Sequence, residues 1–229
     1  MRFLRLFFLL CVVLSNSCPV LCYEILTFGD SITKGAPYIY WSQNGTRVGV
    51  WQPMLEQLLY DDGIPSYVYN WGIGGETTPE GVNRIATVLA SRPANFILIM
   101  EGTNDVLNGI SSSTTQYNIG VMIDLSRGRG VTPIIGTITP NFYLGNSGYN
   151  NLVKDVYNPK IIDVVTAKKV KIAEQYQELR SEWLTYPLHS GDYLHPNKEG
   201  YSRLANTWYA AIVPSPLPPV GAIKLLLLK

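Results

Sequence analysis

Short apolar runs alternate along the chain with longer segments in which apolar residues recur at helical spacing. The runs Ile25–Phe28, Tyr67–Trp71, Phe96–Met100 and Thr132–Ile138 have the length and residue types of buried strands. Phe96–Met100 is apolar at every position, as expected of a central parallel strand that is covered on both sides. Val170–Ala173 fits a fifth strand or the continuation of a preceding helix, and periodicity alone does not decide between them.

Amphipathic helices are predicted in the intervals between these runs. Pro53 is tolerated in the first turn of one helix, and Thr78, followed by Pro and Glu, indicates the start of another. Alternating strands and helices predict an α/β domain with a mostly parallel, five-stranded sheet that helices cover on both faces. The predicted helices are Val50–Leu59, Thr78–Leu89, Thr115–Arg127, Tyr157–Lys168 and Asn197–Ile212.

Two polar segments rich in Tyr, Asn and Gly, Tyr38–Gly49 and Asn141–Asn151, are predicted to be loops. Their residue types suit stacking and hydrogen bonding to sugars, although the same types are common in loops that bind nothing. The aromatic stretch Tyr38–Trp41 fits the lining of a substrate cleft and ordinary packing equally well.

The beginning of the chain has the pattern of a secretory signal peptide. Arg2 and Arg5 precede an apolar run, Leu6–Leu14, which small and polar residues follow. The run is shorter than the ~20 apolar residues of a membrane span, so no stable span is expected, and an uncleaved anchor is the alternative. We therefore expect the protein to be secreted or to reside in the cell envelope.

All three cysteines, Cys11, Cys18 and Cys22, lie in or beside this segment. Cleavage after Cys22 would leave a mature protein with no cysteine, whereas cleavage after Ser17 would leave Cys18 at the terminus, where a lipid could be attached. The predicted organisation is a signal peptide at 1–22, a single folded domain at 23–213, and a Pro-rich linker with a short apolar tail at 214–229.

Composition narrows the class of protein. A chain of 229 residues with 46% apolar and 15% charged residues suits a single globular domain. The net charge of +1 gives no electrostatic case for a nucleic-acid partner. With two histidines and no cysteine beyond Cys22, a zinc cluster is not expected, and we predict no metal.

Three of the predicted strands are followed by turns that carry candidate functional residues, Ser31, Gly75 and Asn104. The carboxyl ends of parallel strands meet at one edge of a sheet, where open α/β sheets bind their ligands. The hydroxyl group of Ser31 is a poor nucleophile unless a base lies nearby. This convergence therefore predicts an active site, provided that another part of the chain supplies the base.

The segment Asp192–Asn197 supplies the missing groups. His195 can take the proton of Ser31 and deliver it to a leaving alcohol, and Asp192 can hold the imidazole in the working tautomer. The backbone N–H groups of Ser31 and Gly75 and the side-chain amide of Asn104 would receive the oxyanion. The predicted reaction is nucleophilic cleavage of an ester.

Four blocks, FGDSIT, NWGIGGET, EGTNDV and DYLHPNKEGY, resemble the blocks of the SGNH hydrolases, also called GDSL lipases/esterases. The resemblance runs from about Ile25 to Ile212. It implies a flavodoxin-like three-layer α/β/α sandwich and hydrolysis of esters or thioesters without a cofactor. It also implies Ser31 as nucleophile, Asp192 and His195 as acid and base, and Gly75 and Asn104 as oxyanion residues, with Gly75 matched through Ile-Gly-Gly-Glu-Thr.

Several neighbouring residues have simpler interpretations. Asp30 is expected to bind amides of its own turn, and Asp105 to stabilise a turn. His189 is expected to be a loop histidine. Gly72 and Gly74 are expected to serve backbone geometry.

The predicted function is a secreted serine esterase that acts on lipid or short- to medium-chain acyl esters. The alternative is an acetylesterase that removes acetyl groups from polysaccharide, so the expected partner is a small-molecule or polysaccharide ester. A non-catalytic carbohydrate- or lipid-binding protein on the same scaffold is a weaker alternative. A flavin or nucleotide site is weaker still, because the chain has no Gly-x-x-x-x-Gly-Lys-Ser/Thr or Gly-x-Gly-x-x-Gly in register. The sequence does not indicate the oligomeric state.

Overall fold

A computed structural model of the chain describes residues 22–38, 44–185 and 188–213. Within them, one sheet of five strands runs in the order β2-β1-β3-β4-β5, and every neighbouring pair is parallel. The predicted parallel sheet is confirmed, and Val170–Ala173 contributes a strand rather than a helix. The strands are β1 Tyr23–Gly29, β2 Ser66–Gly72, β3 Phe96–Met100, β4 Thr132–Gly136 and β5 Lys171–Ala173.

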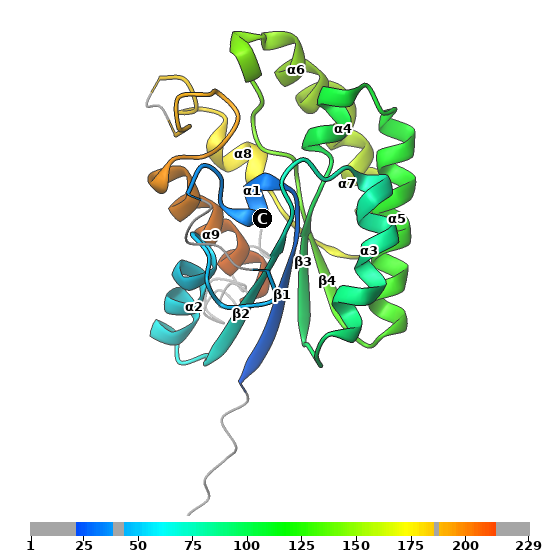
Figure 1. The fold of residues 1–229 in the computed structure, drawn as a ribbon, viewed down its shortest axis with the longest axis vertical. Coiled ribbons are helices and arrows are strands. Elements are labelled where there is room, and N and C mark those ends of the chain that lie inside the picture. The colour runs from blue at the N-terminus through cyan, green and yellow to red at the C-terminus, as the bar shows by residue number, and fades with distance from the viewer. Residues whose placement is uncertain (1–21, 39–43, 186–187, 214–229) are drawn as a thin grey trace, which may run out of the picture.

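Helices cover both faces of the sheet, which gives the three layers of an α/β/α sandwich (Figure 1). One face is covered by α3 Thr78–Ala90, α5 Ser112–Gly128 and α7 Asn158–Ala167. The other face is covered by α2 Gln52–Asp61, α8 Gln175–Leu179 and α9 Lys198–Ile212. Shorter elements follow the carboxyl ends of the strands, namely α1 Ser31–Lys34, α4 Thr103–Asn108, the 3-10 turn η2 Tyr143–Gly145, α6 Ser147–Leu152 and the π-helical turn η3 Val153–Tyr157.

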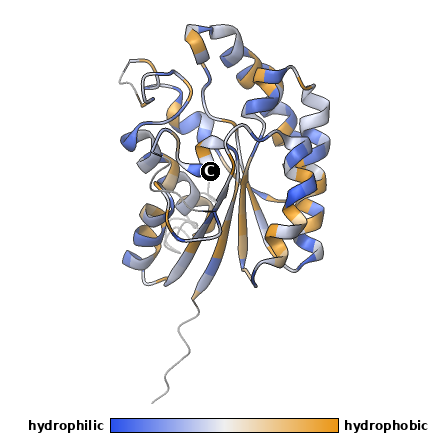
Figure 2. Cartoon of the chain, viewed as in Figure 1, coloured by the Kyte–Doolittle hydropathy of each residue, from blue (hydrophilic) through white to orange (hydrophobic). Residues whose placement is uncertain are grey.

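The core is divided between the two faces by the alternation of side chains along each strand. On β3, Ile97 and Ile99 pack beneath α3 and α5, whereas Leu98 and Met100 pack beneath α2 and α9. Side chains of this size contribute about 1.5–3 kcal/mol each when fully buried. Figure 2 shows α3 and α5 with hydrophobic and hydrophilic positions interleaved, as expected of helices with one buried side.

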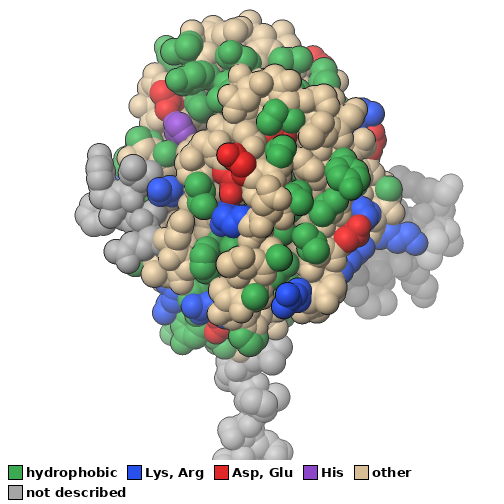
Figure 3. All heavy atoms as spheres, turned by 45° about the vertical axis from the view of Figure 1, so that its right-hand side comes forward, with side chains coloured by type: hydrophobic (Ala, Val, Ile, Leu, Met, Phe, Trp, Pro, Cys, Tyr) green, Lys and Arg blue, Asp and Glu red, His purple; other side chains and the backbone are tan. Residues whose placement is uncertain are grey.

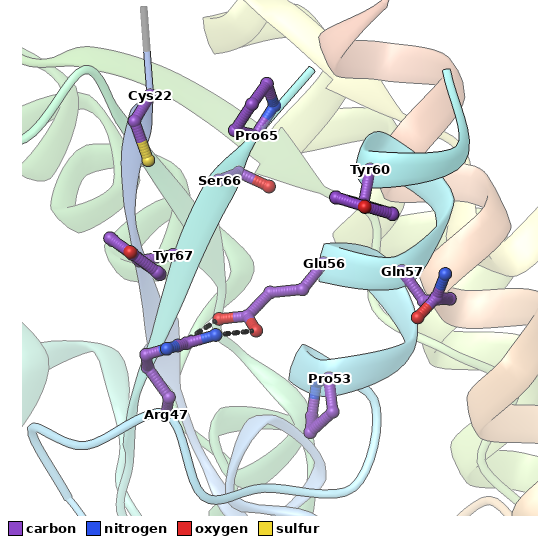
Figure 4. A pocket seen from close by; sticks show the side chains of 9 residues that line it. All are labelled: Cys22, Arg47, Pro53, Glu56, Gln57, Tyr60, Pro65, Ser66 and Tyr67. Carbon is purple, nitrogen blue, oxygen red and sulfur yellow. Dashed lines mark hydrogen bonds and ion pairs between the residues drawn. The ribbon is translucent and has the colours of Figure 1, made fainter. Parts of the chain in front are cut away.

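The edge strand β2 is covered by side chains and loop backbone. Glu56 on α2 accepts a hydrogen bond from the backbone N–H of Val68 (2.7 Å) and forms a two-pronged ion pair with Arg47 (Figure 4). The N–H of Asn70 donates to the carbonyl of Thr46 (2.8 Å). A cavity of about 540 Å³ lies here, and the side chains around it include no serine–histidine pair. The edge is therefore protected against pairing with another strand.

The segment Asn141–Asn151 is not the plain loop that its composition predicts. It contains η2 and most of α6, and the side chain of Asn146 caps α6 by accepting the N–H of Gly148 (2.8 Å). The residues of α6, Ser-Gly-Tyr-Asn-Asn-Leu, have weak helix propensity, so periodicity could not predict the helix.

Helix α3 begins at Thr78, where the predicted helix begins, but Thr78 is not the cap that the sequence indicates. Thr77, not Thr78, is the N-cap, and its N–H donates to the side chain of Glu80 (2.9 Å) in a capping box. The shift leaves Thr78 available for a contact with the turn after β3.

The predicted signal peptide at 1–22, except Cys22, and the linker and tail at 214–229 lie outside the described residues, as do Ile39–Trp41 of the aromatic stretch. Among the helices that the structure describes, none has the length and apolar character required to cross a membrane. Acidic, basic and hydrophobic side chains are interspersed on the face in Figure 3.

Candidate active site

Ser31 lies at the turn between β1 and α1. Gly29 ends the strand at a point where a Cβ atom would lie 2.3 Å from the carbonyl oxygen of Met100, so only glycine fits. The carboxylate of Asp30 then accepts the N–H of Ile32 (2.8 Å) and caps the short helix. This turn places Ser31 at the carboxyl edge of the sheet.

The loop before α9 holds His195 through Asp192. One carboxylate oxygen of Asp192 accepts the N–H groups of Leu194 (3.0 Å) and His195 (2.9 Å). Its other oxygen lies 2.5 Å from Nδ1 of the His195 ring. The same carboxylate therefore shapes the loop and orients the imidazole.

Ser31 and His195 meet although 164 positions separate them along the chain. Oγ of Ser31 lies 2.8 Å from Nε2 of His195. Because Asp192 contacts the opposite ring nitrogen, the three side chains form a hydrogen-bonded chain from Asp192 through His195 to Ser31. This geometry suits proton transfer from the hydroxyl group to the imidazole.

The turns after β2 and β3 contribute to the same cavity as Ser31. Gly75 has a left-handed backbone (φ +81°), which glycine adopts without strain. Asn104, on α4, donates its side-chain amide to the carbonyl of Glu76 (2.8 Å), which leaves its second amide hydrogen for other partners. Both Gly75 and Asn104 line the same cavity as Ser31.

This cavity has a volume of about 360 Å³ and opens to solvent. Apart from the candidate reacting groups and Lys34, the residues that line it are mostly apolar. Its lining residues are Ser31, Lys34, Ala36, Gly74, Gly75, Asn104, Leu107, Tyr143, Leu194 and His195.

Three residues near the site have the structural roles expected from the sequence. Asp30 binds a turn amide, as described above. Asp105 accepts the N–H and hydroxyl of Thr78 (2.8 and 2.5 Å) and the hydroxyl of Thr115 (2.6 Å), which ties the turn after β3 to two helices. At Gly72, a Cβ atom would lie 2.1 Å from the backbone nitrogen of Lys34, so glycine permits this close approach.

His189 does not contact Ser31. Its ring packs 4.4 Å from that of Tyr193 and 5.9 Å from that of Trp183, and its Nδ1 accepts the N–H of Gly191. Partial burial lowers the pKa of His189, which favours the neutral ring. It is a packed loop histidine, as predicted.

The pKa values of two aspartates in and behind the site are shifted in opposite directions. Burial raises the pKa of Asp30 to about 6, although the hydrogen bond from Ile32 opposes the effect. Burial also acts to raise the pKa of Asp192, but hydrogen bonds from His195 and Leu194 outweigh it and hold this pKa below its ordinary value. Asp192 is therefore ionised beside the imidazole at neutral pH.

Sequence reasoning missed a group of ionisable residues behind the turns, formed by Glu76, Arg84 and Glu101. Arg84 on α3 donates to both carboxylate oxygens of Glu76 (2.6 and 2.5 Å), and Glu101 is buried beside them. A signal was present, since an acidic residue directly after an entirely apolar strand is unusual. The apolar wall formed by Leu107 and Leu194 gave no such signal.

No metal centre is apparent in the portion of the chain that the structure describes. There, the histidine, cysteine, aspartate and glutamate side chains form no group of three or more with a geometry suited to a metal ion.

Comparison with known proteins identifies similar chains. The profile of the GDSL-like lipase/acylhydrolase family matches residues 27–203. An arylesterase of Vibrio mimicus is 26% identical over 192 residues, which cover 83% of this chain and 86% of the relative. The uncharacterized lipoprotein YqeF of Bacillus subtilis is 30% identical over 146 residues, 61% of this chain and 57% of the relative. The crystal structure of Axe2, an acetylxylan esterase from Geobacillus stearothermophilus, has a TM-score of 0.69 at 18% identity and covers 84% of this chain and 95% of its own.

Proposed function

The chain belongs to the GDSL-like lipase/acylhydrolase family and is an ester-hydrolysing enzyme, and we propose that Ser31, His195 and Asp192 are its catalytic residues. The observation that carries the proposal is the 2.8 Å contact between Oγ of Ser31 and Nε2 of His195. A serine that only capped a helix would not need an imidazole at this distance.

In the first half of the reaction, Oγ of Ser31 attacks the carbonyl carbon of the ester while Nε2 of His195 takes the hydroxyl proton. The carbonyl oxygen becomes an oxyanion, and Asp192 stabilises the imidazolium ion. The tetrahedral intermediate then collapses. The bond to the alcohol oxygen breaks, and the imidazolium ion donates its proton to the leaving alcohol.

In the second half, water attacks the acyl-enzyme. His195 takes one proton from the water and returns it to Oγ of Ser31 as the acid leaves. The N–H groups of Ser31 and Gly75 and the free amide hydrogen of Asn104 stabilise the oxyanion in both halves. Donors fixed in position before the reaction stabilise the developing charge without having to reorganise.

The apolar wall of the cavity favours a small-molecule ester with a short or medium acyl chain as the substrate. Leu107, Leu194 and the ring of Tyr143 offer apolar contacts to an acyl group, and a volume of about 360 Å³ suits a modest chain. A thioester would react by the same steps. An acetylated polysaccharide is the second candidate, since the open cavity would admit a long chain beside a small acyl group.

Initial rates on a panel of substrates test these proposals. The panel contains p-nitrophenyl esters from acetyl to dodecanoyl, the matching acyl thioesters, acetylated xylan and acetylated pectin. A maximum of kcat/KM at short or medium chain length supports the first candidate, and release of acetate from a polysaccharide supports the second. Equal rates at every chain length without deacetylation would contradict both.

The place of action is proposed to be outside the cytoplasm, either secreted or in the cell envelope. The pattern of Arg2, Arg5 and Leu6–Leu14 supports export. A lipoprotein among the relatives supports the envelope. Expression of the full chain followed by fractionation and N-terminal sequencing tests this proposal. A mature protein that still begins at Met1 and stays inside the cell would contradict it.

A further inference from the structure

Three carboxyl groups meet in the interior behind the turns that line the cavity. They belong to Asp30 after β1, Glu76 after β2 and Glu101 after β3, and the exposed fractions of these residues are 1%, 5% and 1%. The guanidinium of Arg84 pairs with Glu76 through two hydrogen bonds and lies over the ring of Phe28 (4.0 Å). This ion pair accounts for Glu76 but leaves the buried side chain of Glu101 unexplained.

The surroundings of Glu101 indicate that its carboxyl group is protonated. Glu101 is buried, and neither of its carboxyl oxygens has a hydrogen-bond partner among the described residues. The carboxyl group of Glu76 is close enough for its negative charge to act on Glu101. A buried carboxylate without a donor is costly, and two neighbouring carboxylates repel each other, so one of the two is protonated. Glu76 is the ionised partner because it already accepts two hydrogen bonds from Arg84.

The electrostatic environment agrees with this assignment. Burial, followed by the negative charges of Asp30 and Glu76, raises the pKa of Glu101 well above its ordinary value, and Arg84 offsets only part of the effect. Glu101 is therefore a neutral acid at pH 7 that can donate a hydrogen bond.

Glu76 is connected to two of the proposed oxyanion donors. Glu76 follows Gly75, and its main-chain carbonyl accepts the side-chain amide of Asn104 (2.8 Å). A rotation of Glu76 would therefore displace the groups that flank two of the three proposed oxyanion donors. Displacements of about 1 Å at such groups can cost ~10²-fold in rate.

We propose that Glu101 is a positioning residue of the oxyanion hole, which in its protonated form donates a hydrogen bond to the carboxylate of Glu76 and so fixes Gly75 and Asn104. This inference rests on the proposed function of the cavity. Glu101 is not among the residues that line the cavity, so it is not placed to contact a substrate there. Its loss therefore lowers kcat and leaves the acyl-binding wall, and hence KM, nearly unchanged.

Two substitutions separate hydrogen bonding from space filling. Glu101→Gln keeps a donor of the same shape, whereas Glu101→Met keeps the volume and removes the donor. We expect Gln to retain kcat within about threefold. We expect Met to lose about tenfold or more in kcat, with KM changed by less than about twofold. Glu174→Gln is the matched control, because burial also raises the pKa of this half-buried glutamate, which lies outside the cavity lining.

Difference infrared spectroscopy of ¹³C-glutamate-labelled protein tests the proton independently of activity. The wild type at pH 7 is expected to show a carboxylic-acid carbonyl band that disappears in both Glu101 variants and persists in the control. Wild-type kcat in Glu101→Met, or no such band in the wild type, would overturn the proposal.

If Glu101→Met fails to fold, Glu101→Gln still tests the proposal. Loss of the band in Glu101→Gln with retained kcat supports it, and an unchanged band overturns it. If the wild type cleaves no ester, the proposed function fails while the band still decides the protonation of Glu101.

Discussion

The side-chain amide of Asn104 donates to the main-chain carbonyl of Glu76, 28 positions earlier, and joins the turns that follow β2 and β3. One amide hydrogen is thereby committed to the protein, and the other is directed by the same bond. An oxyanion donor held in this way needs no reorganisation when charge develops on the substrate.

Replacement of Asn104 by alanine removes both this link and one proposed donor. We expect kcat to fall by ~10²–10³, the usual effect of losing one oxyanion donor. Steady-state kinetics on the best ester of the panel measure the change, and circular dichroism checks the fold. A loss below tenfold in a folded variant would place the donor elsewhere.

Labelling with a fluorophosphonate tests the nucleophile separately. The probe phosphonylates a serine only when a base activates its hydroxyl group. We expect the wild type to be labelled at Ser31 and Ser31→Ala not to be labelled. Ser190→Ala is the matched control, since the hydroxyl of Ser190 bonds Asp192 (3.2 Å) without contacting His195 through its side chain. Persistent labelling of folded Ser31→Ala would refute the assignment.

Asp30 makes stability depend on pH. Its pKa is about 6 in the folded protein and 3.8 in the reference state, because burial disfavours the charged carboxylate. The folded state thus retains a proton that the unfolded state has lost, so stability falls as pH rises from about 4 to 6. The difference of about two pKa units corresponds to a loss of roughly 3 kcal/mol that is complete above pH 6.

Asp30→Asn removes this titration and keeps the oxygen that caps α1. Urea unfolding at pH 4 to 8 is the measurement. We expect the free energy of unfolding of the variant, relative to the wild type, to increase by roughly 3 kcal/mol between pH 4 and pH 7. A difference that stays constant with pH would show that Asp30 is not the group responsible.

The sheet and its major helices could be predicted from the sequence because their signals are local. Phe96–Met100 is apolar at every position, and glycine punctuates the turns after β1 and β2. The candidate residues followed from their positions at strand ends, together with the four blocks. Helix α6 could not be predicted, because Asn146 and tertiary contacts stabilise residues of weak helix propensity.

The proposed protonation of Glu101 beside Glu76 was also beyond prediction from the sequence. It depends on the meeting of two strand ends and a helix, and no local pattern encodes that meeting. Likewise, the apolar side chains of the cavity, such as Leu107 and Leu194, cannot be distinguished from core residues until the loops are placed.

Alanine substitutions at two glycines test how tightly the side chains around the end of β4 are packed. A Cβ atom at Gly136, the last residue of β4, would lie 2.9 Å from the ring of Trp208 and 3.3 Å from the Cβ of Met100. At Gly128 in α5, a Cβ atom would meet nothing within 4 Å.

We expect Gly136→Ala to lower the free energy of unfolding by about 1–3 kcal/mol through overpacking. Gly128→Ala is expected to raise it by about 0.5–1 kcal/mol, because alanine restricts the unfolded chain and favours helix. Differential scanning calorimetry should therefore show Tm shifts of opposite sign, of about 2–4 °C per kcal/mol for a chain of this size. A Gly136→Ala variant as stable as the wild type would mean that Trp208 is not held against the end of β4.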